Sequence, residues 1–384
     1  MSGRPGRWTL VGPAWPWRGG IAHFGLATAR ALAARGHGVD AVTFRRQYPE
    51  RLFPGRTQLD DGPPPPDLPP ASRLLDPLDP RTWFRAARHV AGSGAEVAVL
   101  MVWMPFFAPM LGVVARRLRK RGVTVLAVVH NAVPHERRPG DRPLTRWMLR
   151  ACDGLLAMSD RVAGDVRRLA PGVPLAVVPH PVYDGFGEPM PRAEARAALS
   201  DAGGPALSGD GPVFLFFGFI RRYKGLHVLL AAWAEVVRRV PGARLVVAGE
   251  FYADEDALRH QAAGLGGSVR LDAQYIPDGQ VGTYFSAADA VVQPYLSATQ
   301  SGVAQIAFHF GRPVITTDVG GLAEVVPDGL AGLVVPPDDP AALADAMVRF
   351  VENDLGPALE AGVAAERERY TWDRLARALE ELAG

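Results

Sequence analysis

Short apolar runs alternate with segments of helical periodicity along most of the chain. Runs typical of strands buried on both faces occur at 8–11, 39–44, 97–102, 123–129, 155–158, 175–178, 213–217, 244–248, 269–271, 290–293, 314–316 and 332–334. Segments with apolar residues three and four positions apart, typical of amphipathic helices, occur at 21–35, 81–92, 106–121, 142–151, 160–169, 226–240, 255–264, 278–287, 302–310 and from 340 onward. This alternation predicts an α/β fold with parallel, doubly wound sheets.

Two segments interrupt the alternation. Residues 45–80 are rich in proline and poor in regular pattern, which favours a long loop. Residues 184–211 are rich in Gly, Pro and Ala, with a short helical insert, and are interpreted as a linker. A chain of 384 residues exceeds one ordinary core. We therefore expect two Rossmann-like domains, 1–185 and 186–370, with a ligand cleft at the carboxyl ends of their strands.

Composition and charge narrow the class of protein. Hydrophobic residues make up 48% and charged residues 21%, as in soluble globular proteins. The single cysteine, Cys152, and the lack of a signal-like N-terminus or a long apolar run predict a cytoplasmic protein. Residues 1–190 carry 26 Lys and Arg against 15 Asp and Glu, and residues 191–384 carry 16 against 25. The basic first half suits an anionic acceptor, an acidic membrane surface or simply solvated arginines on helix faces.

One lysine stands out from this arginine-rich background. Only two of the 42 basic residues are lysines, and Lys224 lies in the turn from Phe217 to Gly225 between an apolar strand and a helix. Arg221 and Arg222 share that turn. Three cations at a strand-to-helix turn predict a cradle for a diphosphate, because the helix start also presents amide groups to an anion. The alternative is a loop with ordinary surface cations.

A second strand-to-helix turn offers small and hydroxyl residues instead of cations. A strand ending at Gln293 is followed by a segment that begins the next helix near Ser301. Its amides and side chains form a candidate anion site, made of Thr299, Gln300, Ser301, Gly302 and Val303, with Gln305 placed to reach a polar ligand group. The alternative is a serine that caps the helix without any ligand.

The first half of the chain offers two further candidates. Gly19 and Gly20 precede the first helix, where glycine lets backbone amides approach an anion or a sugar, although a plain tight turn is the alternative. His130 ends the strand 123–129 and is the best placed histidine for contact with substrate. No P-loop, dinucleotide fingerprint or metal-ligand pattern occurs, and the acidic run 254–256 suits the start of a helix, so we expect no metal and no cofactor.

Together these segments resemble the family 4 glycosyltransferases, retaining enzymes with two facing Rossmann-like domains (the GT-B fold). The similarity runs over nearly the whole chain, in five segments taken in order: Gly19-Gly20, Val129–Asn131, Phe217–Gly225, Ser286–Tyr295 and Gly311–Val325. It implies that Lys224 and the amides near Ser301 bind the donor diphosphate. It also implies that Gly19 and Gly20 approach the diphosphate or sugar, that His130 lies by the anomeric centre, and that the helix 371–384 packs back on the first domain.

The chain departs from the family pattern at two places. Phe219 stands where the family often has arginine, and Arg221 is the candidate to supply that charge. Gln305 and Ser297 stand where the family usually carries two glutamates. Glutamine can hydrogen-bond a ribose hydroxyl but cannot act as a carboxylate nucleophile, which favours front-face attack within an ion pair.

The resemblance therefore predicts a metal-independent, retaining, hexosyltransferase-type enzyme. Its donor would be a UDP or GDP sugar bound mainly by the second domain. A glycan, glycolipid or small-molecule acceptor would bind the first domain, and we expect no nucleic-acid partner. The basic run 116–121 has two interpretations. It either makes peripheral contact with the inner face of the membrane or is the solvated end of a helix. A silent nucleotide-sugar binding module and a nucleotide-sugar epimerase are the alternative functions.

Overall fold

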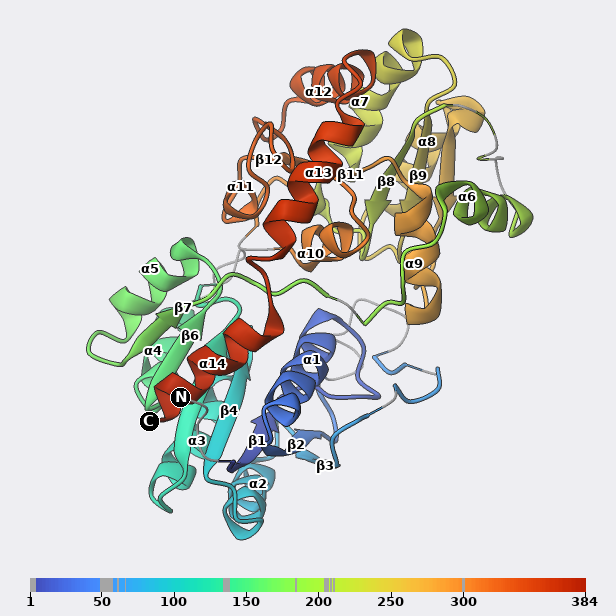
Figure 1. Cartoon of the computed structure of the whole chain (residues 1–384). Helices are drawn as coiled ribbons and strands as arrows, with labels where there is room; N and C mark the ends of the chain where they lie inside the picture. Colours follow the sequence, from blue (N-terminus) through green and yellow to red (C-terminus); the bar gives the residue numbers. More distant parts are fainter. Residues whose placement is uncertain are drawn as a thin grey trace. The chain divides into compact units, whose positions relative to one another are not determined.

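The structure is a computed structural model, and it describes residues 5–48, 58–60, 62–65, 67–133, 139–183, 185–203, 207, 209, 211–298 and 301–384. The chain divides into two compact units, each built on one parallel sheet (Figure 1). The first unit comprises Met1–Pro181 and Thr371–Gly384, and the second comprises Val182–Tyr370. The predicted α/β class with two parallel sheets is confirmed.

The sheet of the first unit has seven parallel strands in the order β3-β2-β1-β4-β5-β6-β7. Strand order reverses between β1 and β4, and ligands of such sheets bind outside the carboxyl ends of the strands at this point. The strands are β1 (Arg7–Val11), β2 (Gly38–Phe44), β3 (Ala71–Leu75), β4 (Val97–Val102), β5 (Thr124–Val129), β6 (Gly154–Ala157) and β7 (Leu175–Val177).

Helices cover the first sheet, and the last of them comes from the far end of the sequence. The helices are α1 (Gly20–Ala34), α2 (Pro80–Gly92), η2 (Pro105–Phe107), α3 (Ala108–Arg119), α4 (Asp141–Leu149), α5 (Asp160–Leu169) and α14 (Trp372–Ala383). In Figure 1, α14 lies beside α1. Arg35 at the end of α1 fixes it through ion pairs with Asp373 and Glu380, at 2.6 and 2.7 Å.

The second unit repeats this architecture with six strands in the order β10-β9-β8-β11-β12-β13. Its strands are β8 (Val213–Phe217), β9 (Arg244–Ala248), β10 (Val269–Asp272), β11 (Ala290–Gln293), β12 (Val314–Thr317) and β13 (Gly332–Val335). Its helices are α6 (Arg192–Asp201), η3 (Arg222–Lys224), α7 (Leu226–Arg239), α8 (Glu255–Ala263), η4 (Gly266–Ser268), α9 (Asp278–Ala287), α10 (Gly302–His309), α11 (Leu322–Val325), α12 (Pro340–Glu352) and α13 (Gly356–Arg367). The strand order reverses between β8 and β11, so the loops that follow these strands form the second switch point.

The prediction of a loop at 45–80 was wrong. The short helical insert predicted within 184–211 is confirmed, but the interpretation of this segment as a linker was wrong. The segment 45–80 contains β3, which pairs in parallel with β2 as an edge strand. Only Leu75 of β3 is fully buried, so the strand lacks the continuous apolar pattern of its neighbours. The segment 184–211 contains α6, which packs on α9 and is tied to Asp289 by Arg196, 2.5 Å away. This helix is therefore part of the second unit and not of a linker.

Within the described part of the chain, no helix is both long enough and apolar enough to span a lipid bilayer.

Candidate active site

The turn that carries Lys224 closes tightly against the loop after β11. Gly225 has φ +71°, and a Cβ on it would lie 1.8 Å from the carbonyl oxygen of Pro294, so only glycine fits here. The Leu296 amide donates a hydrogen bond of 2.7 Å to the carbonyl oxygen of Tyr223. Both contacts join the loops of the two strands that flank the switch point. The local sequence thus positions the cation turn at the usual ligand edge of the sheet.

Lys224 is a half-buried ammonium group without a carboxylate partner. Its Nζ lies 5.6 Å from the centre of the Tyr295 ring and 3.0 Å from where a Cβ on Gly218 would stand. Among the described residues no Asp or Glu forms an ion pair with it. Loss of hydration, together with the charge of Arg221, lowers the pKa of Lys224 to about 8. The attraction of a bound anion would offset both effects.

The start of α10 lies next to the same lysine turn. A Cβ on Gly218 would come within 3.8 Å of Cγ2 of Val303, in the first turn of α10. Ser301 caps this helix, since its Oγ accepts a hydrogen bond from the Val303 amide at 3.3 Å. That hydroxyl is oriented in turn by the Gln293 side-chain amide, which donates to it at 2.9 Å. The structure therefore brings Lys224 together with Ser301, Gly302 and Val303, whereas Thr299 and Gln300 lie outside the described residues.

Gln305 is a buried amide whose side chain has no hydrogen-bond partner among the described residues. Its exposed fraction is 0%, and neither Oε1 nor Nε2 is paired. Oε1 of Gln293 is also buried and unpaired within that part of the chain. Unpaired buried polar atoms are costly and call for an explanation, such as an absent ligand or water. Gln305 is thus a polar group of the same helix start that is still available to a ligand.

Three aromatic rings beside the lysine turn were not recognised in the sequence as a site. Phe219, Tyr252 and Tyr275 follow β8, β9 and β10, respectively. The Phe219 ring lies 4.7 Å from that of Tyr252 and is stacked at 6.5 Å on that of Tyr275. Arg221 covers Tyr252, with its guanidinium carbon 4.9 Å from the ring centre. Aromatic residues at three successive strand ends were the sequence signal for this group.

Arg222, the third cation of the turn, points elsewhere. It is exposed and lies 3.8 Å from Asp254 at the start of α8. Among the described residues no group of three or more His, Cys, Asp or Glu side chains is arranged to hold a metal ion.

The glycine pair of the first unit lies at the start of α1. Gly19 has φ +111°, a backbone conformation that glycine adopts without strain, and Gly20 begins the helix. A Cβ on Gly19 would meet nothing within 4 Å. The space on the side-chain side of Gly19 is therefore open.

His130 is a buried neutral imidazole at the end of β5. Its ring stands edge-on to Phe24 of α1, with centroids 4.6 Å apart, and Phe24 also contacts His180 at 5.2 Å. Burial, with a smaller effect of His180, lowers the pKa of His130 to about 3. Its Nε2 has no hydrogen-bond partner among the described residues. The ring nitrogen is thus free to meet a substrate group.

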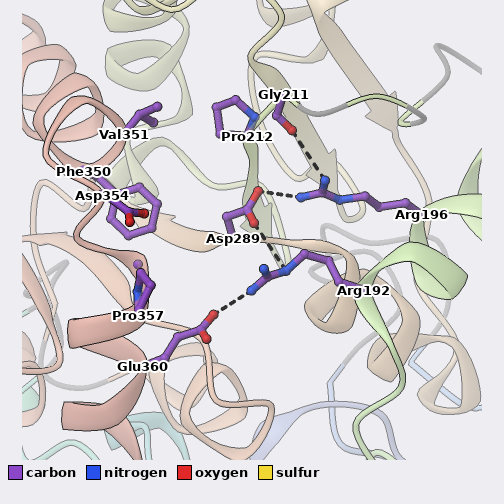
Figure 2. Close-up of a pocket in the computed structure, with 11 residues that line it drawn as sticks. Arg192, Arg196, Gly211, Pro212, Asp289, Phe350, Val351, Asp354, Pro357 and Glu360 are labelled. Carbon is purple, nitrogen blue, oxygen red and sulfur yellow. Dashed lines mark hydrogen bonds and ion pairs between the residues drawn. The ribbon is translucent and has the colours of Figure 1, made fainter.

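A separate cavity of about 280 Å³ in the second unit does not belong to this site. It lies at the amino ends of β8 and β11, the edge opposite to Lys224. Figure 2 shows Arg192 and Arg196 directed at Asp289, and Glu360 bound to Arg192. These charges are paired with one another. We therefore interpret the cavity as the space around the ion-pair cluster that fixes α6.

Comparison with known proteins identifies family domains in both halves of the chain. Residues 18–184 match the family model described as Glycosyltransferase Family 4, and residues 211–353 match the one described as Glycosyl transferases group 1.

Two relatives and one solved structure illustrate the extent of the similarity. The D-inositol 3-phosphate glycosyltransferase of Acidothermus cellulolyticus is 30% identical over 389 residues, which cover 92% of this chain and 83% of that protein. The protein of the same name from Nocardioides sp. is 33% identical over 248 residues, which cover 60% of this chain and only 53% of that protein. The crystal structure of Anabaena HepE in complex with UDP has a TM-score of 0.74 at 15% identity and 98% coverage of both chains, which shows a shared fold.

Proposed function

Because the chain belongs to the family 4 glycosyltransferases, which have the GT-B fold, we propose that it transfers a sugar from a nucleotide-diphosphate sugar to an acceptor hydroxyl. The observation that carries this proposal is Lys224, a half-buried cation without a carboxylate partner among the described residues, beside the start of α10. A cation and a helix start that meet at a switch point are suited to a diphosphate.

The diphosphate is the leaving group in this reaction. The bond between the anomeric carbon and the diphosphate oxygen breaks, and a bond from the same carbon to the acceptor oxygen forms. Lys224, Arg221 and the amides of Gly302 and Val303 stabilise the negative charge that develops on the diphosphate. No metal ion and no further cofactor is required in this scheme, because these cationic and amide groups already oppose that charge.

The nucleoside would be held by the neighbouring groups. The ring group of Phe219, Tyr252 and Tyr275 offers a stacking surface for a base. The unpaired amide of Gln305 can exchange hydrogen bonds with ribose hydroxyls. These groups support a nucleotide donor, with UDP and GDP sugars as the proposed candidates.

Retention of configuration is proposed without a carboxylate nucleophile. Gln305 and Ser297 occupy the positions where the family usually has glutamates, and neither can form a glycosyl ester. We therefore favour front-face attack within an ion pair, in which the acceptor proton passes to an oxygen of the leaving diphosphate. His130, neutral and with a free Nε2, would hydrogen-bond the sugar near the anomeric centre.

The acceptor is proposed to bind the first unit, near the Gly19-Gly20 turn. Relatives named as D-inositol 3-phosphate glycosyltransferases suggest a phosphorylated polyol as one candidate, beside glycans and glycolipids. The proposed location is the cytoplasm, with peripheral contact to the inner face of the membrane.

A donor and acceptor screen with product analysis tests the proposal. The protein is incubated with UDP, GDP and ADP sugars and a panel of acceptors, and products are followed by mass spectrometry and proton NMR of the anomeric centre. We expect one donor to yield a glycosylated acceptor with retained configuration. Binding without turnover across the panel would instead identify a silent binding module, and a changed sugar without an acceptor would identify an epimerase.

A further inference from the structure

Large exposed hydrophobic side chains gather on one part of the first unit. Among the described residues seven such side chains are exposed, and only Leu330 lies outside the segment 78–147. The other six belong to α2, η2, α4 and the turns before them: Leu78, Phe84, Met104, Phe106, Leu144 and Trp147. Single exposed hydrophobic residues are ordinary, but a concentration of them on one surface marks an interaction site.

Arginines of α3 hold the exposed rings of the two helices beside it. Helix α3 packs against both α2 and α4. Arg117 covers the Phe84 ring of α2 at 4.7 Å, and Arg116 covers the Trp147 ring of α4 at 3.8 Å. The Trp147 ring also lies directly on Gly112, where a Cβ would come within 2.1 Å of it. The rings are therefore fixed at the surface, each with a guanidinium group against it.

The segments that supply these side chains carry a strong excess of positive charge. Residues 78–133 and 139–150 hold 11 Lys and Arg residues against three Asp and Glu residues. Arg85, Arg117, Arg121 and Arg146 are exposed, and the described residues offer them no carboxylate within ion-pair distance. Unpaired cations on adjacent helices produce a field that attracts an anionic surface.

We propose that this aromatic–basic face, made of Phe84, Phe106, Leu144, Trp147, Arg85, Arg117, Arg121 and Arg146, docks on an anionic phospholipid bilayer. Guanidinium groups bind lipid phosphates, while tryptophan, phenylalanine and leucine enter the interface between headgroups and acyl chains. The excess of positive charge favours an anionic lipid surface over a protein partner, because a protein partner would need an equally dense acidic patch. This face is the proposed location of the membrane contact, and its docking does not depend on the transfer reaction.

Flotation with lipid vesicles tests the docking face. The protein is mixed with phosphatidylcholine vesicles, with or without 30 mol% phosphatidylglycerol, at about 50 and 500 mM salt. We expect binding to the anionic vesicles only, and weaker binding at high salt because the attraction is screened. Reversal of three charges in Arg117→Glu, Arg121→Glu, Arg146→Glu should lower the vesicle partition coefficient about tenfold or more.

Two further variants separate a docking face from a general charge effect. Arg349→Glu, Arg367→Glu, Arg374→Glu changes the net charge equally at exposed sites of α12, α13 and α14, and it should leave vesicle binding within about twofold of the parent. Phe106→Ser with Leu144→Ser should remove the binding that persists at 500 mM salt.

Equal loss of binding in both charge variants, or no binding of the parent protein to anionic vesicles, would overturn the proposal. Nucleotide affinity is measured in solution on the same preparations. Loss of vesicle binding with unchanged nucleotide affinity concerns the docking face and not the donor site.

Discussion

The ammonium nitrogen of Lys224 lies 5.6 Å from the centre of the Tyr295 ring, although the two residues follow different strands of the second sheet. The face of an aromatic ring attracts a cation but does not neutralise it. Lys224 is therefore held in place in its charged form and retains the capacity to bind an anion.

Donor binding should weaken above the pKa of Lys224. That pKa is about 8 in the free protein, and a bound diphosphate raises it. Below pH 8 the lysine is charged both in the free and in the bound protein, so affinity is constant. Above pH 8 binding must take up a proton, and affinity for UDP or GDP falls by up to about tenfold per pH unit. Titration calorimetry from pH 7.5 to 9.5 measures this, and Lys224→Arg should abolish the decline.

The close contact between Gly218 and Lys224 should make Gly218→Ala a binding defect. An added Cβ would lie 3.0 Å from Nζ of Lys224, and φ is +99°. Gly242→Ala is the matched control, because φ is +89° and its nearest neighbour would be 3.9 Å away. Both variants should lose about 1 kcal/mol of stability or somewhat more. Only Gly218→Ala should also weaken nucleotide binding, and equal affinities would refute the role of this contact.

Two buried histidines should make the first unit sensitive to acid. The pKa values of His130 and His180 are about 3 and 4, because burial disfavours the charged ring. The unfolded chain binds these protons near pH 6.5, whereas the folded chain does not. Their effect on stability is therefore favourable above pH 6.5 and is lost as the pH falls, by up to about 1.4 kcal/mol per pH unit for each ring.

Urea unfolding at several pH values checks this dependence. His130→Gln should reduce the slope of unfolding free energy between pH 6 and 4.5, while the same change at the exposed His260 should leave it unchanged. An unaltered slope in His130→Gln would contradict the neutral, buried state of the ring.

The ion-pair cluster at the opposite edge should contribute to stability and not to donor binding. Asp289 accepts hydrogen bonds from the Val213 amide at 2.6 Å and from Arg196 at 2.5 Å. Asp289→Ala should therefore cost about 2–4 kcal/mol of unfolding free energy. Asp345→Ala breaks an exposed pair with Arg239 and should cost about 0–1 kcal/mol. Chemical denaturation checks both values, and similar losses would exclude a special role of Asp289.

Most strands were predictable because central parallel strands are continuous apolar runs. β8 and β9 were placed with their observed limits for this reason. β3 was missed because an edge strand buries few residues, and its sequence is half polar. The attachment of α6 to the second unit could not be predicted from local sequence. Arg196 of α6 pairs with Asp289, which lies 93 positions away in the chain.

Candidate site residues could be selected from the sequence one by one, but their arrangement could not. Lys224 could be selected because lysine is rare in this chain and follows a strand. Its distance from Tyr295 and the proximity of Gly218 to Val303 depend on the pairing of β8 with β11, which local sequence does not specify. Phe219, Tyr252 and Tyr275 come from three separate turns, and their sequence positions at strand ends did not show that the three rings lie together.

The chain contains only two lysines, and comparing them tests the donor site most directly. Lys224→Ala and Lys120→Ala remove the same charge, but Lys120 is exposed at the end of α3 in the first unit. Calorimetric titration with UDP, GDP and ADP first identifies the nucleotide that the parent protein binds. Loss of a charge-assisted interaction of about 1.5–3 kcal/mol should then weaken its binding about 10- to 150-fold in Lys224→Ala and leave Lys120→Ala unchanged. Unchanged affinity in Lys224→Ala would contradict the assignment of the diphosphate site.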